Sequence, residues 1–135
     1  MLRQIDDNIN FLHKALDGVW LRDKAIKHNM SNANTPNYKR IDVNFQDKLK
    51  EAVRKEESRL LRTHEKHLPI SNKIGDLSPS VEIDKSYSYR FDGNNVNIDT
   101  ESAELAKNSI MYNALVDQTI KEFDMIKNVI IEGGK

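Results

Sequence analysis

Cysteine is absent from this chain, and glycine, proline and aromatic residues are scarce, with three prolines and five glycines among 135 positions. Without cysteine the chain has neither a disulfide framework nor a thiolate site. It also has no apolar run of about 18 residues or more, so the sequence predicts no membrane-spanning helix. Residues 1–7 lack the basic and apolar regions and the small-residue cleavage site of a secretory signal. By themselves, these absences favour a cytoplasmic protein.

Neither sign of charge predominates, because 21 basic residues balance 21 acidic ones. This balance gives no indication of nucleic acid or an anionic membrane as a partner. Hydrophobic residues make up 38% of the chain, which is low for a compact globule, and charged residues make up 31%. The length suits a single domain.

Two short segments resemble ligand sites only in part. His64 and His67 have a spacing that suits half of a zinc site on a helix, but Pro69 follows and further ligands are missing. Residues 92–99 lack the alternating carboxylates and the terminal glutamate of an EF-hand. The chain also has no Gly-rich phosphate loop, no Ser/His/Asp or Cys/His arrangement and no carboxylate pair in apolar surroundings. We therefore expect no catalytic residue, metal, cofactor or small-molecule substrate, and no enzymatic activity.

Apolar residues form a stripe along the first 33 residues of the chain. They recur at intervals that alternate between three and four positions. This spacing predicts a helix over residues 1–33 that buries a narrow face against another helix. Asp23 occupies the one position that breaks the pattern, and Gly18 costs about 1 kcal/mol relative to alanine, so we expect bending or fraying within residues 17–23. The predicted N-terminal assembly seam consists of Ile5, Ile9, Leu12, Leu16, Val19, Ile26 and Met30.

The stripe ends at the polar string Asn34-Thr35-Pro36-Asn37. Pro36 has no N–H and disfavours the helical conformation at Thr35, so it ends the helix. Asn37 is of a residue type that tolerates a left-handed backbone. The string therefore predicts a defined turn with Asn37 in that conformation.

For the middle of the chain, residues 34–98, the sequence predicts several short elements. Residues 41–45 alternate apolar and polar side chains as an extended segment does, and Gln46 to Arg62 are rich in helix formers. Residues 64–88 have no periodicity and predict a flexible loop, with a weak extended run at 81–83. The turn signal at residues 92–95 favours a small β-hairpin over residues 87–98.

A second heptad helix is predicted over residues 99–135, capped by Asp99 or Thr100 and ended by Gly133-Gly134. The predicted C-terminal assembly seam consists of Leu105, Tyr112, Val116, Phe123, Ile126 and Ile130. The fold class is therefore mainly α, with two long terminal helices forming a coiled-coil-like bundle around the short central elements in one structural unit. The low apolar content and the strong terminal heptads suggest that much of the burial takes place between chains.

The segment from Asn29 to Lys39 resembles a signature of the flagellar axial proteins, which are the rod, hook and hook-associated subunits. That signature is usually Asn-x-small-Asn-Ala-x-Thr-Pro-Gly-Tyr-Lys. Ser31 replaces its small apolar residue and Asn37 replaces its glycine. The positions that match are Asn29, Asn32, Ala33, Thr35, Pro36, Tyr38 and Lys39. We take Asn29, Asn32, Ala33, Thr35, Pro36, Asn37 and Tyr38 as the signature turn.

A second segment is similar to the C-terminal half of flagellar basal-body rod proteins of the B type. It consists of Asp92-Gly93-Asn94-Asn95-Val96-Asn97-Ile98-Asp99, followed by Leu105-Ala106-Lys107-Asn108 and Tyr112-Asn113-Ala114-Leu115. Asn97 stands where that family usually has aspartate. The resemblance covers both ends of the chain and leaves residues from about 65 to 88 unmatched.

This resemblance implies a structural subunit that polymerises helically into the proximal rod, transmits torque and links the membrane ring and export gate to the distal rod. The implied partners are copies of the chain, other rod proteins, the rod/membrane-ring junction protein and the export gate. Axial subunits leave the cell through the flagellum's own export apparatus without a cleaved signal. The resemblance thus favours the basal body, across the periplasm, over the cytoplasm.

A second interpretation comes from a different functional class. Two amphipathic helices that pair within one chain are also typical of a soluble helical adaptor or an export-chaperone-like binding module. Such a protein would be a stable, compact monomer, whereas a rod subunit would bury its seams against neighbouring subunits.

Overall fold

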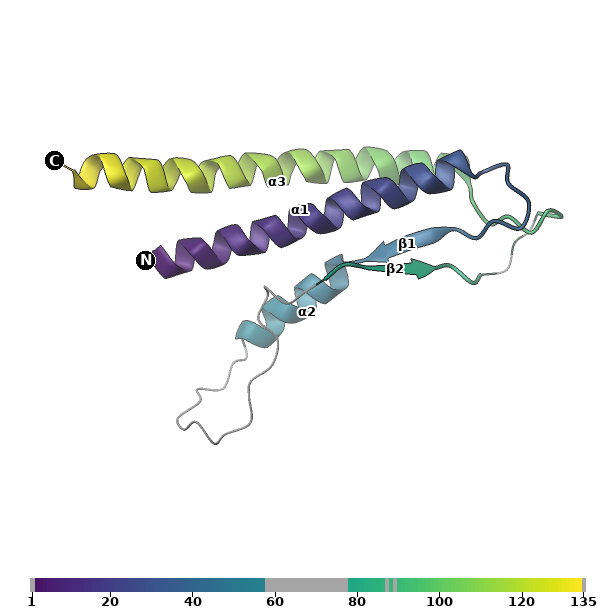
Figure 1. Ribbon diagram of the computed structural model, residues 1–135, viewed down its shortest axis with the longest axis horizontal. Helices are drawn as coiled ribbons and strands as arrows, with labels where there is room; N and C mark the ends of the chain where they lie inside the picture. Colours follow the sequence, from purple (N-terminus) through teal and green to yellow (C-terminus); the bar gives the residue numbers. More distant parts are fainter. Residues whose placement is uncertain (1, 58–77, 87, 89, 135) are drawn as a thin grey trace, which may run out of the picture.

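The computed structural model describes residues 2–57, 78–86, 88 and 90–134. Two long helices, α1 (Leu2–Ser31) and α3 (Ile98–Gly133), lie side by side and run in opposite directions (Figure 1). Between them in the chain come strand β1 (Ile41–Asn44), helix α2 (Gln46–Glu57) and strand β2 (Ser80–Ile83). The mainly α architecture with long terminal helices, a short central helix and a small antiparallel sheet is thus confirmed.

The sheet is formed by two segments that are distant in the sequence. β1 and β2 pair antiparallel, with Ile41 opposite Ile83 and Val43 opposite Val81. The segment at 41–45 was predicted from its alternating side chains and the one at 81–83 as a weak extended run, but their pairing was not predicted. The predicted hairpin over residues 87–98 is wrong, because its described residues contain no strand and Ile98 already belongs to α3. Instead of a strand ladder, hydrogen bonds with residues around the signature turn hold the described part of this segment, as shown below. Tyr87 and Tyr89 lie outside the described residues.

The ends of the helices follow the local sequence with one exception. α3 ends at Gly133 with Gly134 as its C-cap, as predicted. Its N-cap is Asn97, whose side chain accepts a hydrogen bond from the backbone N–H of Asp99 at 2.9 Å, so the predicted cap at Asp99 or Thr100 is wrong. The described part of α2 ends at Glu57. The continuation to Arg62, the histidines at 64 and 67, and most of the predicted loop lie outside the described residues.

A small apolar core joins the sheet and α2 to one side of α1. Ala25, Val43 and Phe45 are buried together, and Leu21 and Leu49 pack against them. Burying a side chain such as Phe45 contributes about 1.5–3 kcal/mol. This core attaches the central elements to α1, while α3 packs along the same helix through contacts of its own.

Gly18 is the point at which Phe45 meets α1. A Cβ atom placed on Gly18 would lie 2.0 Å from Cδ1 of Phe45, so the ring occupies the space that any side chain would need. α1 runs without interruption from Leu2 to Ser31, so the predicted fraying near residues 17–23 is wrong. The contact with Phe45 offsets the helix-propensity cost of the glycine.

We expect Gly18→Ala to lower the free energy of unfolding by about 1–3 kcal/mol, because the Phe45 ring must leave its position. Alanine is the better helix former, so helix propensity alone would make Gly18→Ala stabilising. A lower free energy of unfolding would therefore point to the contact with the ring. Gly133→Ala is the matched control, because a Cβ there meets nothing within 4 Å. Urea denaturation followed by circular dichroism measures both. Equal or higher stability of Gly18→Ala would show that the ring does not rest on this glycine.

Candidate functional site: the junction of two asparagine-rich segments

The signature turn lies where α1 ends and meets the segment that leads into α3. We call this contact between residues 28–42 and residues 84–86, 88 and 90–101 the junction. Asn37 has a φ of 59°, which confirms the predicted left-handed conformation. Its backbone N–H donates to the carbonyl oxygen of Asp92 at 2.7 Å. The turn is therefore shaped by its own sequence and held by a segment more than fifty residues away.

Asn94 is the centre of this contact and has no exposed surface. Its side-chain N–H groups lie within hydrogen-bonding distance of the carbonyl oxygens of Asn32 (2.9 Å), Ala33 (3.1 Å) and Thr35 (2.9 Å). Its side-chain oxygen accepts from the backbone N–H of Val96 at 2.8 Å. These three carbonyls belong to the turn that follows Ser31, the last residue of α1. Asn94 thus supplies, from a distant segment, hydrogen bonds to backbone groups of a turn that lies outside any helix.

Asn29 has an equivalent role on the other side of the turn and is also fully buried. Its side chain donates to the carbonyl of Ile41 at 2.8 Å and accepts from the N–H of the same residue at 2.9 Å. The amide therefore pairs with Ile41 as a neighbouring strand would. Tyr38 donates its hydroxyl to the same side-chain oxygen at 2.9 Å. This arrangement ties the start of β1 to the last turn of α1.

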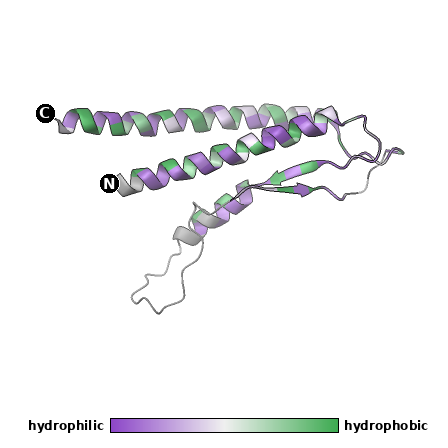
Figure 2. Ribbon diagram, viewed as in Figure 1, coloured by the Kyte–Doolittle hydropathy of each residue, from purple (hydrophilic) through white to green (hydrophobic). Residues whose placement is uncertain are grey.

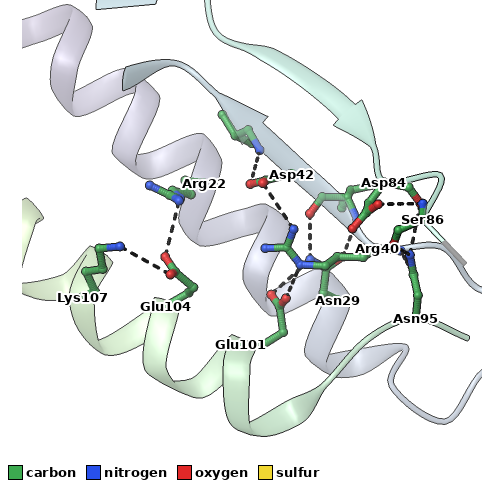
Figure 3. A network of polar contacts seen from close by, with 12 residues as sticks. Arg22, Asn29, Arg40, Asp42, Asp84, Ser86, Asn95, Glu101, Glu104 and Lys107 are labelled. Carbon is green, nitrogen blue, oxygen red and sulfur yellow. Dashed lines mark hydrogen bonds and ion pairs between the residues drawn. The ribbon is translucent and has the colours of Figure 1, made fainter. Parts of the chain in front are cut away.

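The charged part of the junction is the pair of Arg40 and Glu101, shown in Figure 3. Glu101 has no exposed surface, and its two carboxylate oxygens accept from Arg40 Nε at 2.6 Å and from Asn29 Nδ2 at 3.1 Å. Burial by itself would lower the pKa of Arg40, but the hydrogen bond and charge of Glu101, with a further contribution from Asp42, raise it above its ordinary value. The Arg40 guanidinium is therefore charged in the folded protein near neutral pH.

The backbone of Arg40 extends the same network toward β2. Its N–H donates to the side-chain oxygen of Asn95 at 2.7 Å, and the Asn95 amide donates to the carbonyl of Asp84 at 3.2 Å (Figure 3). The N–H of Ser86 donates to the Asp84 carboxylate, and this hydrogen bond is the main reason that the pKa of Asp84 lies below its ordinary value. Residues just after β2 are thereby joined to the start of β1.

Tyr38 and His28 form the exposed edge of the junction. Because the Tyr38 hydroxyl donates to Asn29, it accepts from Nδ1 of His28 at 2.8 Å. Burial, and to a smaller extent the negative charge of Glu101, raise the pKa of Tyr38 above its ordinary value. The phenol is therefore un-ionised at neutral pH and remains available as a donor.

The turn at Asp92 and Gly93 closes the junction from the opposite side. Gly93 has a φ of 73°, and a Cβ there would lie 2.8 Å from the side-chain oxygen of Asn37. Lys39 donates its ammonium to the Gly93 carbonyl at 2.9 Å. Arg90 holds both oxygens of Asp92 and lowers the pKa of that carboxyl chiefly through its hydrogen bonds, while its other terminal nitrogen donates to the Ala33 carbonyl at 3.0 Å. Two left-handed residues thus face each other.

The chemistry of the junction is that of a lock between two chain segments. The buried amide and carboxylate groups at its centre are engaged by one another or by the backbone. Within the described part of the chain, no group of three or more His, Asp or Glu side chains is arranged to hold a metal ion. Such a site fixes the direction in which the chain leaves α1.

The structure brings most of the predicted signature turn into the junction. Asn29 and Ala33 are buried, Asn32 and Tyr38 are half-buried, and Thr35, Pro36 and Asn37 are exposed. Sequence reasoning missed the partners that hold this turn: Arg40, Arg90, Asn94, Asn95 and Glu101. The one signal was the second family-like segment, which contains Asn94 and Asn95, because two segments typical of one family are expected to serve one structure.

The two predicted seams differ in how far the chain itself buries them. Leu12, Val19 and Ile26 are buried within the chain, and Ile5, Ile9, Leu16 and Met30 are half-buried. On α3, Leu105, Val116 and Ile126 are half-buried, whereas Tyr112, Phe123 and Ile130 are 45%, 54% and 68% exposed. The structure therefore does not bring the two stripes together as one continuous seam.

The reason lies in the face that α3 presents to α1. Its buried residues are Glu101, Asn108 and Glu122, and Asn108 donates to the backbone carbonyl of Val19 at 3.0 Å. Glu122 precedes the predicted seam residue Phe123 by one position, which corresponds to a rotation of about 100° about the helix axis. This rotation leaves the aromatic part of the predicted stripe on the outside.

Among the described residues, no helix is both long enough and apolar enough to cross a membrane.

No protein-family model matches the chain. The chain is, however, 38% identical over 129 residues to the flagellar basal body rod protein FlgB of Bacillus subtilis, with 94% of this chain and 95% of the relative aligned. The FlgB of Borreliella burgdorferi is 31% identical over 134 residues, which cover 96% and 99% of the two chains. The FlgB of Escherichia coli is 26% identical over 144 residues, which cover 98% and 99%.

We expect Asn94→Asp to lower the free energy of unfolding by about 3 kcal/mol or more, because a buried carboxylate would face three carbonyl oxygens. The substitution keeps the size of the side chain and its bond to Val96. Asn113→Asp, at an exposed position of α3, is the control and should change stability by about 0.5 kcal/mol or less. Urea denaturation measures both. Similar values for the two variants would show that Asn94 does not hold the turn.

At Asn37 we expect the effect of a substitution to depend on the backbone conformation. Asn37→Gly should be neutral or stabilising, whereas Asn37→Val should cost about 1–2 kcal/mol because a left-handed backbone brings Cβ too close to the following carbonyl. Asn44→Val, at an exposed position of β1, places the same side chain on an extended backbone and should be harmless. Thermal unfolding ranks the three variants. The left-handed turn would be unimportant if Asn37→Val were as stable as Asn37→Gly.

Proposed function

Because this chain belongs to the family of flagellar basal body rod proteins FlgB, we propose that it polymerises helically into the proximal part of the rod. It is a structural component of the flagellar basal body rod, and its partners include other rod proteins. The observation that carries the finer proposal is the apolar surface that α3 leaves uncovered. We propose that this surface is buried only when subunits meet.

The uncovered surface is large for a helix of a monomeric protein. Figure 2 shows hydrophobic residues along α3 as far as its C-terminal end, which extends beyond the N-terminal end of α1. Exposed apolar patches of this kind are typical of interaction sites. The members that are at least 45% exposed are Ile98, Ile110, Tyr112, Ile120, Phe123, Met125, Val129, Ile130 and Ile131. Their number supports a neighbour along much of α3.

The junction supports a mechanical role for the subunit. The α1–α3 hairpin is closed at one end by buried hydrogen bonds and the Arg40–Glu101 ion pair, so the two helices are tied together at that end. A torque applied to one helix would pass to the other through these bonds. We propose that the subunit transmits torque in this way and links the membrane ring and export gate to the distal rod.

The remaining parts of the proposal follow from membership of the family. We propose that copies of the chain, the rod/membrane-ring junction protein and the export gate are among its partners. We also propose that the chain reaches the rod through the flagellar export apparatus without cleavage of a signal. Mass spectrometry of purified basal bodies tests this, because an uncleaved chain would yield a peptide beginning at Met1 or Leu2.

The pairing of α1 with α3 within one chain favours a second candidate, a soluble helical adaptor. An adaptor of this kind would bind exported subunits and remain outside the finished rod. Its exposed α3 surface would then bind a transient client. Purified basal bodies separate the two candidates, because a rod subunit is retained in them and an adaptor is not.

We expect Phe123→Asp to abolish rod assembly and swimming in cells that depend on this chain, while the purified variant stays folded. The side chain is 54% exposed in the monomer, so the new charge is costly only where a neighbour buries it. Lys121→Asp, which introduces the same carboxylate at an exposed position on another face of α3, is the control and should assemble. Basal-body purification and swimming assays measure the outcome. Normal rods built from Phe123→Asp would exclude this surface as an assembly contact.

A further inference from the structure

An apolar groove opens between α1, β1, α2 and the inward side of α3, with a volume of about 520 Å³. Phe11, Ala15 and Gly18 line it from α1, Phe45 and Leu49 from the chain around α2, and Met111 and Leu115 from α3. This volume is typical of a groove that holds a ligand or several side chains. The groove is separate from the junction, and the hydrogen bonds described above do not fill it.

The groove matches one segment of α3 in length. Its lining on α1 runs from Phe11 to Arg22, eleven residue steps, which span about 17 Å in a helix. The stripe of α3 from Tyr112 to Phe123 also spans eleven steps, and it contains half-buried Val116 and exposed Ile120. Lys127 interrupts the stripe one turn beyond Phe123, so the uninterrupted apolar part has the length of the groove.

The two surfaces also match in charge. The charged residues that line the groove are Arg22, Lys50 and Arg54, all of them basic. Arg22 pairs with Glu104, whereas within the described residues no ion pair engages Lys50 or Arg54. Along the stripe, Asp117 precedes Ile120 by three residues and Asp124 follows it by four, so both carboxylates border the stripe on one side. A basic rim would thus meet an acidic border.

We propose that the groove of one subunit receives the α3 stripe, residues 112–124, of a second copy of this chain, an inference that rests on the proposed function. The groove and the stripe occupy different faces of the same α3, so one chain cannot fill its own groove. A contact between two different surfaces is heterologous, and when its rotation does not close it generates an open helical array. The geometry therefore gives a specific basis for helical polymerisation.

Cross-linking in assembled rods tests the contact directly, because the chain has no cysteine of its own. We expect a chain carrying both Arg54→Cys and Asp124→Cys to form dimers and higher multimers with a short bismaleimide in purified basal bodies. A chain carrying Lys85→Cys and Asp124→Cys is the matched control, because exposed Lys85 lies outside the groove, and it should not form multimers. Dimers from Asp124→Cys alone would indicate that stripe meets stripe and would overturn the proposal.

Charge reversal provides the second arm of the test. Lys50→Glu with Arg54→Glu, or Asp117→Lys with Asp124→Lys, should each reduce the amount of chain in basal bodies about tenfold, because like charges would face each other. All four substitutions in one chain restore opposite charges at every contact and should restore assembly. No recovery in the quadruple variant would contradict the pairing of these groups.

The outcomes separate this inference from the proposed function. If the chain is present in basal bodies but the cysteine pair cross-links only to another protein or not at all, the groove has a different occupant and the proposed function stands. If the unmodified chain is absent from basal bodies, both the proposed function and the groove contact are wrong.

Discussion

Glu101 is a carboxylate with no exposed surface, and an unpaired charge in such a place would cost several kcal/mol. The hydrogen bonds from Arg40 and Asn29 remove most of that cost. To make them, the last turn of α1, the start of β1 and the first turn of α3 must lie together. The tight reversal of the chain after α1 follows from this requirement, and the left-handed Asn37 follows from the reversal.

Asparagine is the residue that makes this closed end possible. Its amide offers donors and an acceptor on one short side chain, so it can pair with backbone groups that no helix or strand engages. Asn29 pairs with both backbone groups of Ile41, Asn94 pairs with carbonyls of the turn that follows α1, and Asn97 caps α3. The asparagine-rich character of both segments thus has one physical explanation. Each amide replaces a regular hydrogen bond where the chain changes direction.

α3 has two faces with different roles in the subunit. Its inward face carries polar groups such as Asn108 and Glu122, and its contact with α1 depends on specific hydrogen bonds as well as apolar burial. Its outward face carries larger apolar groups, including Phe123 and Ile130. Large apolar groups on an exposed helix face are typical of a surface that binds a neighbour, which agrees with membership of a family of rod proteins.

The sequence by itself determined the features that depend on neighbours in the chain. Heptad spacing predicted the two terminal helices, and Pro36 and Asn37 predicted the end of the first helix and its left-handed residue. Side-chain alternation predicted the extended segment at 41–45, and a weak extended run was predicted at 81–83. The tertiary structure alone decided which strands pair, which face of α3 turns inward and why Gly18 does not interrupt α1. These outcomes depend on contacts between distant residues, such as Asn108 with Val19 and Phe45 with Gly18. Periodicity identifies an apolar stripe on a helix. It does not show which face of the helix a distant partner covers, because that depends on the hydrogen bonds and the steric fit between the two.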